Sequence, residues 1–152
     1  MSEAKLDKIW KVMSPDLIKN AKRSYSYLID KSIGDSDEDI IKSLICMMPN
    51  RFDMPIDLYL FQFTIGSGCL PGSASYALTN VSERLCTEHY DEIKPALDFM
   101  SERKHCPEKY KTKQFLCTVA LQHMLDMEPF DIMTVSDARI VQQLNKWYVK
   151  CR

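Results

Sequence analysis

Apolar residues recur every three or four positions along most of the 152-residue chain, which is the period of a helix with one buried face. A typical stripe consists of Leu6, Ile9 and Met13, and another contains Ile140 and Leu144 near the C-terminus. Together the stripes predict helices over residues 3–13, 15–33, 37–48, 74–85, 93–100, 107–127 and 137–151.

Serine residues mark the starts of three of these helices. Ser14 precedes Pro15, and proline is well tolerated as the first residue of a helix. Ser36 is followed three residues later by Asp39, as in a capping box, and Ser136 precedes the last stripe. Hydroxyl side chains at these positions accept hydrogen bonds from the first free backbone N–H groups of the helix.

Two segments do not show the simple one-sided pattern. The segment 56–65 combines aromatic and branched residues with a length that suits either a short strand or a buried helix, and both readings stay open. The segment 115–121 is apolar almost all round, which is typical of a helix enclosed by others. The predicted fold is all-α: a single compact bundle of seven or eight helices around a central helix at about 107–127, in one domain over residues 1–152.

Composition agrees with one ordinary globular core. Apolar residues make up 45% of the chain and charged residues 27%, which excludes the disordered and low-complexity classes. The net charge of −1 indicates no class of partner. Because the N-terminus has no apolar signal-like run and no segment is long enough to span a bilayer, we expect a soluble cytoplasmic protein with no membrane partner and with its six cysteines reduced.

The first candidate site is a glycine-rich loop that leads into a helix. Backbone N–H groups in such a loop can hold a phosphate-type ligand, and a cysteine there can become a reactive thiolate. No lysine follows the glycines as in a P-loop, so a simple connection between helices is the alternative interpretation. The candidate ligand-binding residues are Gly66, Ser67, Gly68, Cys69, Gly72 and Ser73.

The second candidate is a zinc site made of two Cys/His pairs. Cys86 and His89 lie three positions apart, and His105 and Cys106 follow in the next break. Four such side chains can form a tetrahedral site. Adjacent residues are poorly placed to bind one ion together, so we predict no metal and no other cofactor, with Cys86 in a helix core and both histidines in solvent.

The third candidate is a cluster of basic residues around the start of the 107–127 helix. Cations with an aromatic among them can bind a nucleic-acid backbone or an acidic partner. The sequence pI of about 6.3 makes nucleic acid the less favoured partner, and a solvated basic surface is the alternative. The cluster consists of Arg103, Lys104, Lys109, Tyr110, Lys111 and Lys113.

No set of nucleophile, base and acid identifies an enzyme, so we expect a regulatory or accessory module that acts by binding another protein. Methionine-rich helical surfaces often bind partner helices, and this chain has nine methionines, among them Met47, Met48, Met54, Met124 and Met127. The Trp147–Tyr148 pair suits either a homodimer face or the closure of the core. The alternative function is ligand binding or catalysis at residues 66–73.

Overall fold

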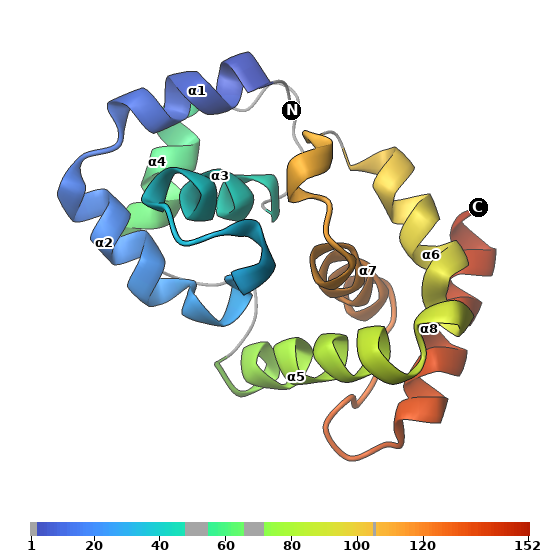
Figure 1. The fold of residues 1–152 in the computed structure, drawn as a ribbon. Coiled ribbons are helices and arrows are strands. Elements are labelled where there is room, and N and C mark those ends of the chain that lie inside the picture. Colours follow the sequence, from blue (N-terminus) through green and yellow to red (C-terminus); the bar gives the residue numbers. More distant parts are fainter. Residues whose placement is uncertain (1–2, 48–54, 66–71, 105) are drawn as a thin grey trace. The chain divides into compact units, whose positions relative to one another are not determined.

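The computed structural model describes residues 3–47, 55–65, 72–104 and 106–152 (Figure 1). Within these ranges the protein is all-α, with eight α-helices and no strand, as the sequence predicts. None of the helices in the described ranges combines the length and the apolar character that crossing a bilayer requires.

Contacts divide the chain into two compact units. The first unit comprises Met1–Pro71 and Lys104–Thr112, and the second comprises Gly72–Arg103 and Lys113–Arg152. The prediction of one domain over residues 1–152 stays a prediction.

The first unit contains four α-helices and three short 3-10 helices. The α-helices are α1 (Glu3–Val12), α2 (Pro15–Ser24), α3 (Asp37–Met47) and α4 (Ile56–Ile65). The 3-10 helices are η1 (Ser26–Leu28), η2 (Lys31–Ile33) and η3 (Glu108–Tyr110).

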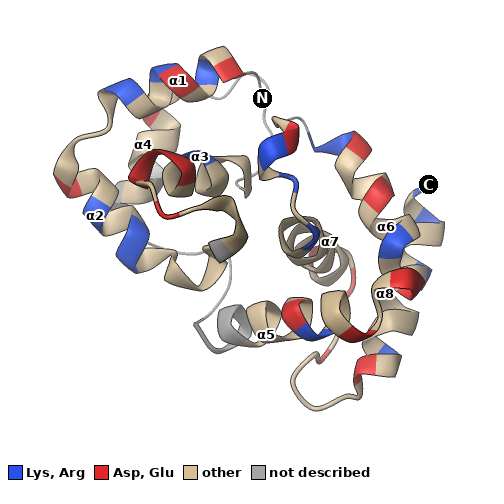
Figure 2. Ribbon diagram, viewed as in Figure 1, with Lys and Arg blue, Asp and Glu red and all other residues tan. Residues whose placement is uncertain are grey.

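The core of the first unit forms around α3, whose residues from Ile40 to Met47 are all buried except Lys42. Lys42 reaches outward to Asp7 of α1 at 2.5 Å and to Glu38 at 2.8 Å. The first turn of α3 is acidic and is drawn red in Figure 2. Ser36 accepts the backbone N–H of Asp39 at 3.1 Å, which confirms the predicted cap.

Segment 56–65 is a helix, so the strand alternative is wrong. Tyr59 and Phe63, four residues apart, are both buried, which is the spacing of one helical face. This face packs on α2 and α1. In a strand Phe61 would lie on the same side as Tyr59 and Phe63, whereas it is 57% exposed.

The predicted helix over 15–33 is too long, because α2 ends at Ser24. Tyr25 then leaves helical geometry, with φ −112° and ψ 22°, and packs edge-on against the ring of Phe63. Further along, the Asp30 carboxylate accepts the backbone N–H of Ser32 at 2.9 Å and also accepts the hydroxyl of Thr112. These contacts stabilise 3-10 turns in the segment where the apolar periodicity predicted that the α-helix continues.

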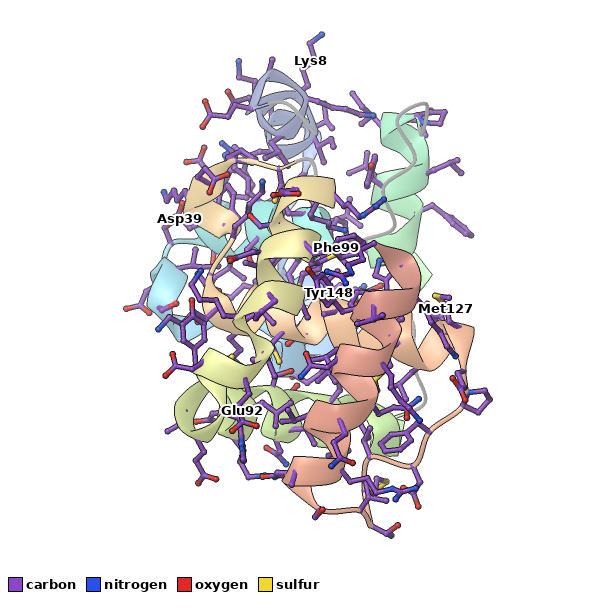
Figure 3. The ribbon with its side chains drawn as sticks, turned by 90° about the vertical axis from the view of Figure 1, so that its right-hand side faces the viewer. Lys8, Asp39, Glu92, Phe99, Met127 and Tyr148 are labelled. Atoms are coloured by element: carbon purple, nitrogen blue, oxygen red, sulfur yellow. The ribbon has the colours of Figure 1, made fainter. Side chains whose placement is uncertain are left out.

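The second unit contains α5 (Gly72–Glu88), α6 (Tyr90–Arg103), α7 (Lys113–Met127) and α8 (Asp137–Cys151). Helix α7 contacts the other three helices of this unit, and its residues from Phe115 to Leu121 are all buried. The enclosed helix predicted from its apolar sequence is therefore confirmed within this unit. The rings of Phe99 in α6 and Tyr148 in α8 meet edge to face in the same unit, with centroids 5.4 Å apart (Figure 3).

The enclosed helix begins at Lys113 rather than at residue 107 as predicted. Pro107 has an extended backbone, with ψ 143°, and the next three residues form η3. Lys109 and Tyr110 of this turn both reach Asp39 of α3. The turn therefore belongs to the first unit, and the helix starts only after it.

Candidate functional site

The outer face of α4 carries exposed apolar side chains. Of the ten residues of α4 only Asp57 is charged, and Leu58 and Phe61 are 49% and 57% exposed. These two residues lie three positions apart on the side of the helix opposite the buried Tyr59 and Phe63. Large apolar side chains this exposed are typical of a surface that binds a partner when they lie together.

Three contacts fix how α4 lies on its neighbours in the first unit. The side-chain amide of Asn20 in α2 donates a hydrogen bond to the backbone oxygen of Phe63. The rings of Tyr25 and Phe63 meet edge to face, with centroids 5.9 Å apart. On the other side, Lys5 of α1 lies over the ring of Tyr59, with its Nζ atom 5.3 Å from the centroid. Leu58 and Phe61 therefore point away from both supporting helices.

The edge of α1 next to α4 is basic. Lys5, Lys8 and Val12 are spaced three and four positions apart, so they share one side of α1, and the contact of Lys5 with Tyr59 identifies it as the side toward α4. Asp7, on another side of the helix, pairs with Lys42 of α3 instead. Lys8 projects outward from α1 (Figure 3), and Val12 is 55% exposed.

Helix α2 adds a third cation. The guanidinium of Arg23 donates to the amide oxygen of Asn20 at 3.1 Å, and the same amide binds α4. Exposed apolar residues and cations thus lie on three helices of the first unit, namely α4 and the helices α1 and α2 that contact it. We call this set the α4 surface; it consists of Val12, Leu58, Phe61, Lys5, Lys8 and Arg23.

The predicted basic cluster is divided between the two units. In the first unit, Lys109 pairs with Asp39 at 2.6 Å and Lys111 pairs with Glu108 at 3.2 Å. Lys104 is buried, with 5% of its surface exposed. Tyr110 is buried too, and desolvation beside the Asp39 carboxylate raises its pKa to about 12.

The two members of the basic cluster in the second unit are both held over aromatic rings. The guanidinium carbon of Arg103 lies 4.2 Å from the centroid of Phe99. The Nζ atom of Lys113 lies 3.9 Å from the centroid of Tyr90. Every cation of the predicted cluster is therefore paired, stacked or buried, and a nucleic-acid site there stays a prediction without further support.

The structure gives the predicted zinc ligands other partners. Cys86 of the second unit is hydrogen-bonded to Cys117, and Cys106 of the first unit is hydrogen-bonded to Cys46. His105 lies outside the described residues. All cysteines in the described ranges are free thiols: Cys46, Cys86, Cys106, Cys117 and Cys151.

His89 lies in a different cluster, together with Glu88 and Asp137, whose ligand atoms are within 4.8 Å of one another. Arg84 already engages both oxygens of Asp137, at 3.0 and 3.1 Å, and this pairing lowers the pKa of Asp137. The Nδ1 atom of His89 is 3.1 Å from Glu92. A metal ion would have to displace the Arg84 guanidinium, so the cluster is better explained as an ion-pair network.

The glycine-rich candidate falls largely outside the described residues. This holds for Gly66, Ser67, Gly68 and Cys69, while Gly72 and Ser73 are the first residues of α5. Ligand binding or thiol chemistry at this loop stays a prediction.

The α4 surface was missed in the sequence because its residues lie on three helices. The available signal was that only one of the ten residues of α4 is charged, so the helix is more apolar than one buried face requires. Among the methionines singled out from the sequence, Met47 and Met124 are buried and Met127 is exposed, while Met48 and Met54 lie outside the described residues. Trp147 is buried against Phe99 and helps to close the second unit.

No protein-family model, no curated protein and no solved structure matches this chain significantly.

Proposed function

We propose that the protein acts by protein–protein contact and that the α4 surface binds an acidic, amphipathic segment of a partner. The observation that carries the proposal is the outward exposure of Leu58 and Phe61 on a helix with one charge in ten residues. Burying both side chains in a complex would remove a large apolar area from water, at about 25 cal/mol per Å².

The three cations of the α4 surface outnumber the one carboxylate of α4, the exposed Asp57, and so favour an acidic partner. Lys5 and Lys8 lie on α1 and Arg23 lies on α2, the two helices against which α4 packs. Carboxylates at the edges of an apolar stripe on the partner would meet these cations at the rim of the complex. Rim charges of this kind chiefly raise the association rate and select the partner, while the apolar centre supplies the affinity.

Binding is tested with two fluorescent synthetic peptides that have the same leucine stripe at positions i, i+3, i+4 and i+7. One peptide carries glutamates at its remaining positions, and the matched control peptide carries lysines at the same positions. We expect the acidic peptide to bind more tightly to the full-length protein, by anisotropy titration, and its affinity to fall as salt is raised. Equal affinity for the two peptides contradicts the proposed charge preference.

The surface itself is tested with the double variant Leu58→Ser/Phe61→Ser. We expect its affinity for the acidic peptide to fall by at least about tenfold, or about 1.4 kcal/mol. The matched control is Met133→Ser, which removes an apolar side chain that is 62% exposed in the second unit. An equal loss in the control, or no loss in the double variant, overturns the assignment to α4.

The natural partner is sought with a photo-crosslinking residue placed at position 61 in cells, with position 133 as the control site. We expect a protein that crosslinks from position 61 only, through a segment rich in Asp and Glu. Identical crosslinks from both positions would contradict a specific surface.

A further inference from the structure

The first unit holds two thiols that are hydrogen-bonded to each other although 60 positions separate them. Cys46 lies on the buried side of α3, with 1% of its surface exposed. Cys106 is partly exposed and lies in the turn before η3, where its backbone N–H donates to the Lys104 oxygen at 3.1 Å. A buried thiol beside an accessible one is the arrangement of a resolving cysteine beside a reactive cysteine.

Several contacts hold the Cys106 turn against α3. Lys109 pairs with Asp39 at 2.6 Å, and the Tyr110 hydroxyl lies 3.5 Å from the same carboxylate. Thr112 donates its hydroxyl to Asp30 at the end of the segment. The two sulfur atoms are therefore brought together by the fold, and not by an encounter of two loose segments.

The surroundings of Cys106 stabilise its thiolate. The Cys46 thiol donates a hydrogen bond to it, and the ammonium groups of Lys111 and Lys104 lie close enough to attract its charge. Together they lower the pKa of Cys106, although its partial burial opposes them. The hydrogen bond to the Cys106 sulfur and burial raise the pKa of Cys46, so Cys106 gives up its proton more readily than Cys46 does.

The second unit supplies an internal comparison. Cys86 of α5 and Cys117 of α7 are also hydrogen-bonded, but Cys117 is fully buried beside the uncharged Ser82. The bond with Cys86 and burial raise the pKa of Cys117. With its pKa raised and its side chain buried, Cys117 lacks the thiolate character and the access that a nucleophilic cysteine needs.

We infer that Cys106 is a nucleophilic thiol that reacts with hydroperoxides and that Cys46 resolves the product into a reversible disulfide. In the first step the Cys106 thiolate sulfur attacks the terminal peroxide oxygen. The O–O bond breaks, Cys106 becomes a sulfenic acid, and the leaving hydroxide or alkoxide takes a proton to become water or an alcohol.

In the second step the Cys46 sulfur attacks the sulfenic sulfur of Cys106. The S–O bond breaks, and the departing hydroxide leaves as water with the proton of the Cys46 thiol. Over both steps the two thiols lose two electrons and two protons, and the hydroperoxide is reduced. A small thiol or dithiol reverses the reaction by exchange.

The experiment treats the reduced full-length protein with one equivalent of hydrogen peroxide and maps the thiols by alkylation and peptide mass spectrometry. We expect a Cys46–Cys106 disulfide with the Cys86 and Cys117 thiols still free. Finding Cys46 and Cys106 both still free, or the Cys86–Cys117 pair oxidised first, overturns the inference.

Three variants separate the roles of the sulfurs. Cys46→Ser should accumulate a sulfenic acid on Cys106 that dimedone traps, because no resolving thiol remains. Cys106→Ser should slow the loss of the remaining thiols to peroxide by at least about tenfold. The matched control Cys117→Ser should leave the Cys46–Cys106 reaction unchanged. Sulfenic acid on another cysteine in Cys46→Ser, or an unchanged rate in Cys106→Ser, contradicts the assignment.

One measurement needs no variant and so does not depend on a substituted chain folding. Cys86 and Cys106 are both partly exposed, so limited iodoacetamide labelling of the native protein compares their reactivity directly. We expect Cys106 to be alkylated at least about tenfold faster than Cys86. Equal labelling rates would show that the lysines do not activate Cys106.

Discussion

Gly34 is the residue whose backbone most clearly requires a particular amino acid. Its φ of +126° and ψ of 176° fall in a region that side chains with a Cβ atom rarely enter. An added Cβ would lie 3.5 Å from an Asp39 carboxylate oxygen, which is an ordinary contact. The requirement for glycine therefore comes from the backbone conformation and not from lack of space.

We expect Gly34→Ala to lower the free energy of unfolding by about 1–3 kcal/mol, because alanine must adopt the strained φ or force the turn before α3 to rearrange. Urea denaturation measures the change. The control is Asp35→Ala at the exposed neighbouring position, which should change stability by less than about 0.5 kcal/mol. Similar losses for the two variants would contradict the backbone explanation.

Asp39 is the residue at which α3 and η3 are joined by charge. A hydrogen bond from Lys109, with further hydrogen bonds from Ser36 and Tyr110, holds its pKa below the ordinary value of 3.8 although desolvation opposes this. Since the folded protein binds this proton less tightly than the unfolded chain, the carboxylate stabilises the fold above about pH 4 and stops doing so as the pH falls through its lowered pKa.

We expect Asp39→Asn to lower the free energy of unfolding by about 1 kcal/mol at pH 7, and the difference from the parent protein to shrink as the pH falls below 4. Urea denaturation across this pH range measures it. The control Asp98→Asn removes the exposed i,i+4 pair with Lys94, which should matter less. A difference that persists unchanged at low pH would contradict the electrostatic explanation.

At the scale of elements, the buried contact between α5 and α7 includes a pair of hydroxyl groups. Thr118 donates its hydroxyl to Ser82 at 3.0 Å, and both residues are buried. A buried hydroxyl without a partner costs free energy, whereas removing both hydroxyls together costs much less. The pair therefore makes the pairing of these two helices specific as well as stable.

We expect Thr118→Val alone to destabilise the protein by about 1–3 kcal/mol, because it leaves Ser82 without this hydrogen bond. The double variant Ser82→Ala/Thr118→Val should cost less than the sum of the two single variants, as measured by urea denaturation in a double-mutant cycle. Additive losses would show that the hydroxyls do not act as a pair.

The helix boundaries also show which features of the elements can be predicted from the sequence. The caps at Ser14, Ser36 and Ser136 could be predicted because each depends on residues within three positions. The start of α7 could not be predicted in this way, because it depends on the contacts of Lys109 and Tyr110 with Asp39, about 70 positions away. For the same reason the end of α2 and the start of α7 were predicted less well than the existence of these helices.

At the scale of the whole molecule, the chain passes between the two units three times, and the segment Lys104–Thr112 returns to the first. Tyr110 is the largest buried side chain of that segment. Its ring and the Lys109 ion pair hold the segment on α3, so this short segment completes the first unit.

We expect Tyr110→Ala to speed backbone hydrogen exchange in α3, because truncating a buried aromatic side chain costs about 3–5 kcal/mol. Exchange in α8 of the second unit should change less, which hydrogen-exchange mass spectrometry can resolve by peptide. The control Tyr148→Ala alters an aromatic side chain of the second unit that packs on Phe99. Equal acceleration in both units after Tyr110→Ala would show that they open together.

The amino-acid sequence by itself determined the all-α class, the approximate places of the helices, the three serine caps and the enclosed position of Phe115 to Leu121. All of these follow from side chains within a few positions of one another, where the helical period and local hydrogen bonds decide the outcome. Tertiary structure alone decided that residues 104–112 belong with α3, that Cys46 meets Cys106, and that Leu58 and Phe61 face outward. These depend on which apolar faces cover one another, and that choice is made by packing between segments far apart in the chain.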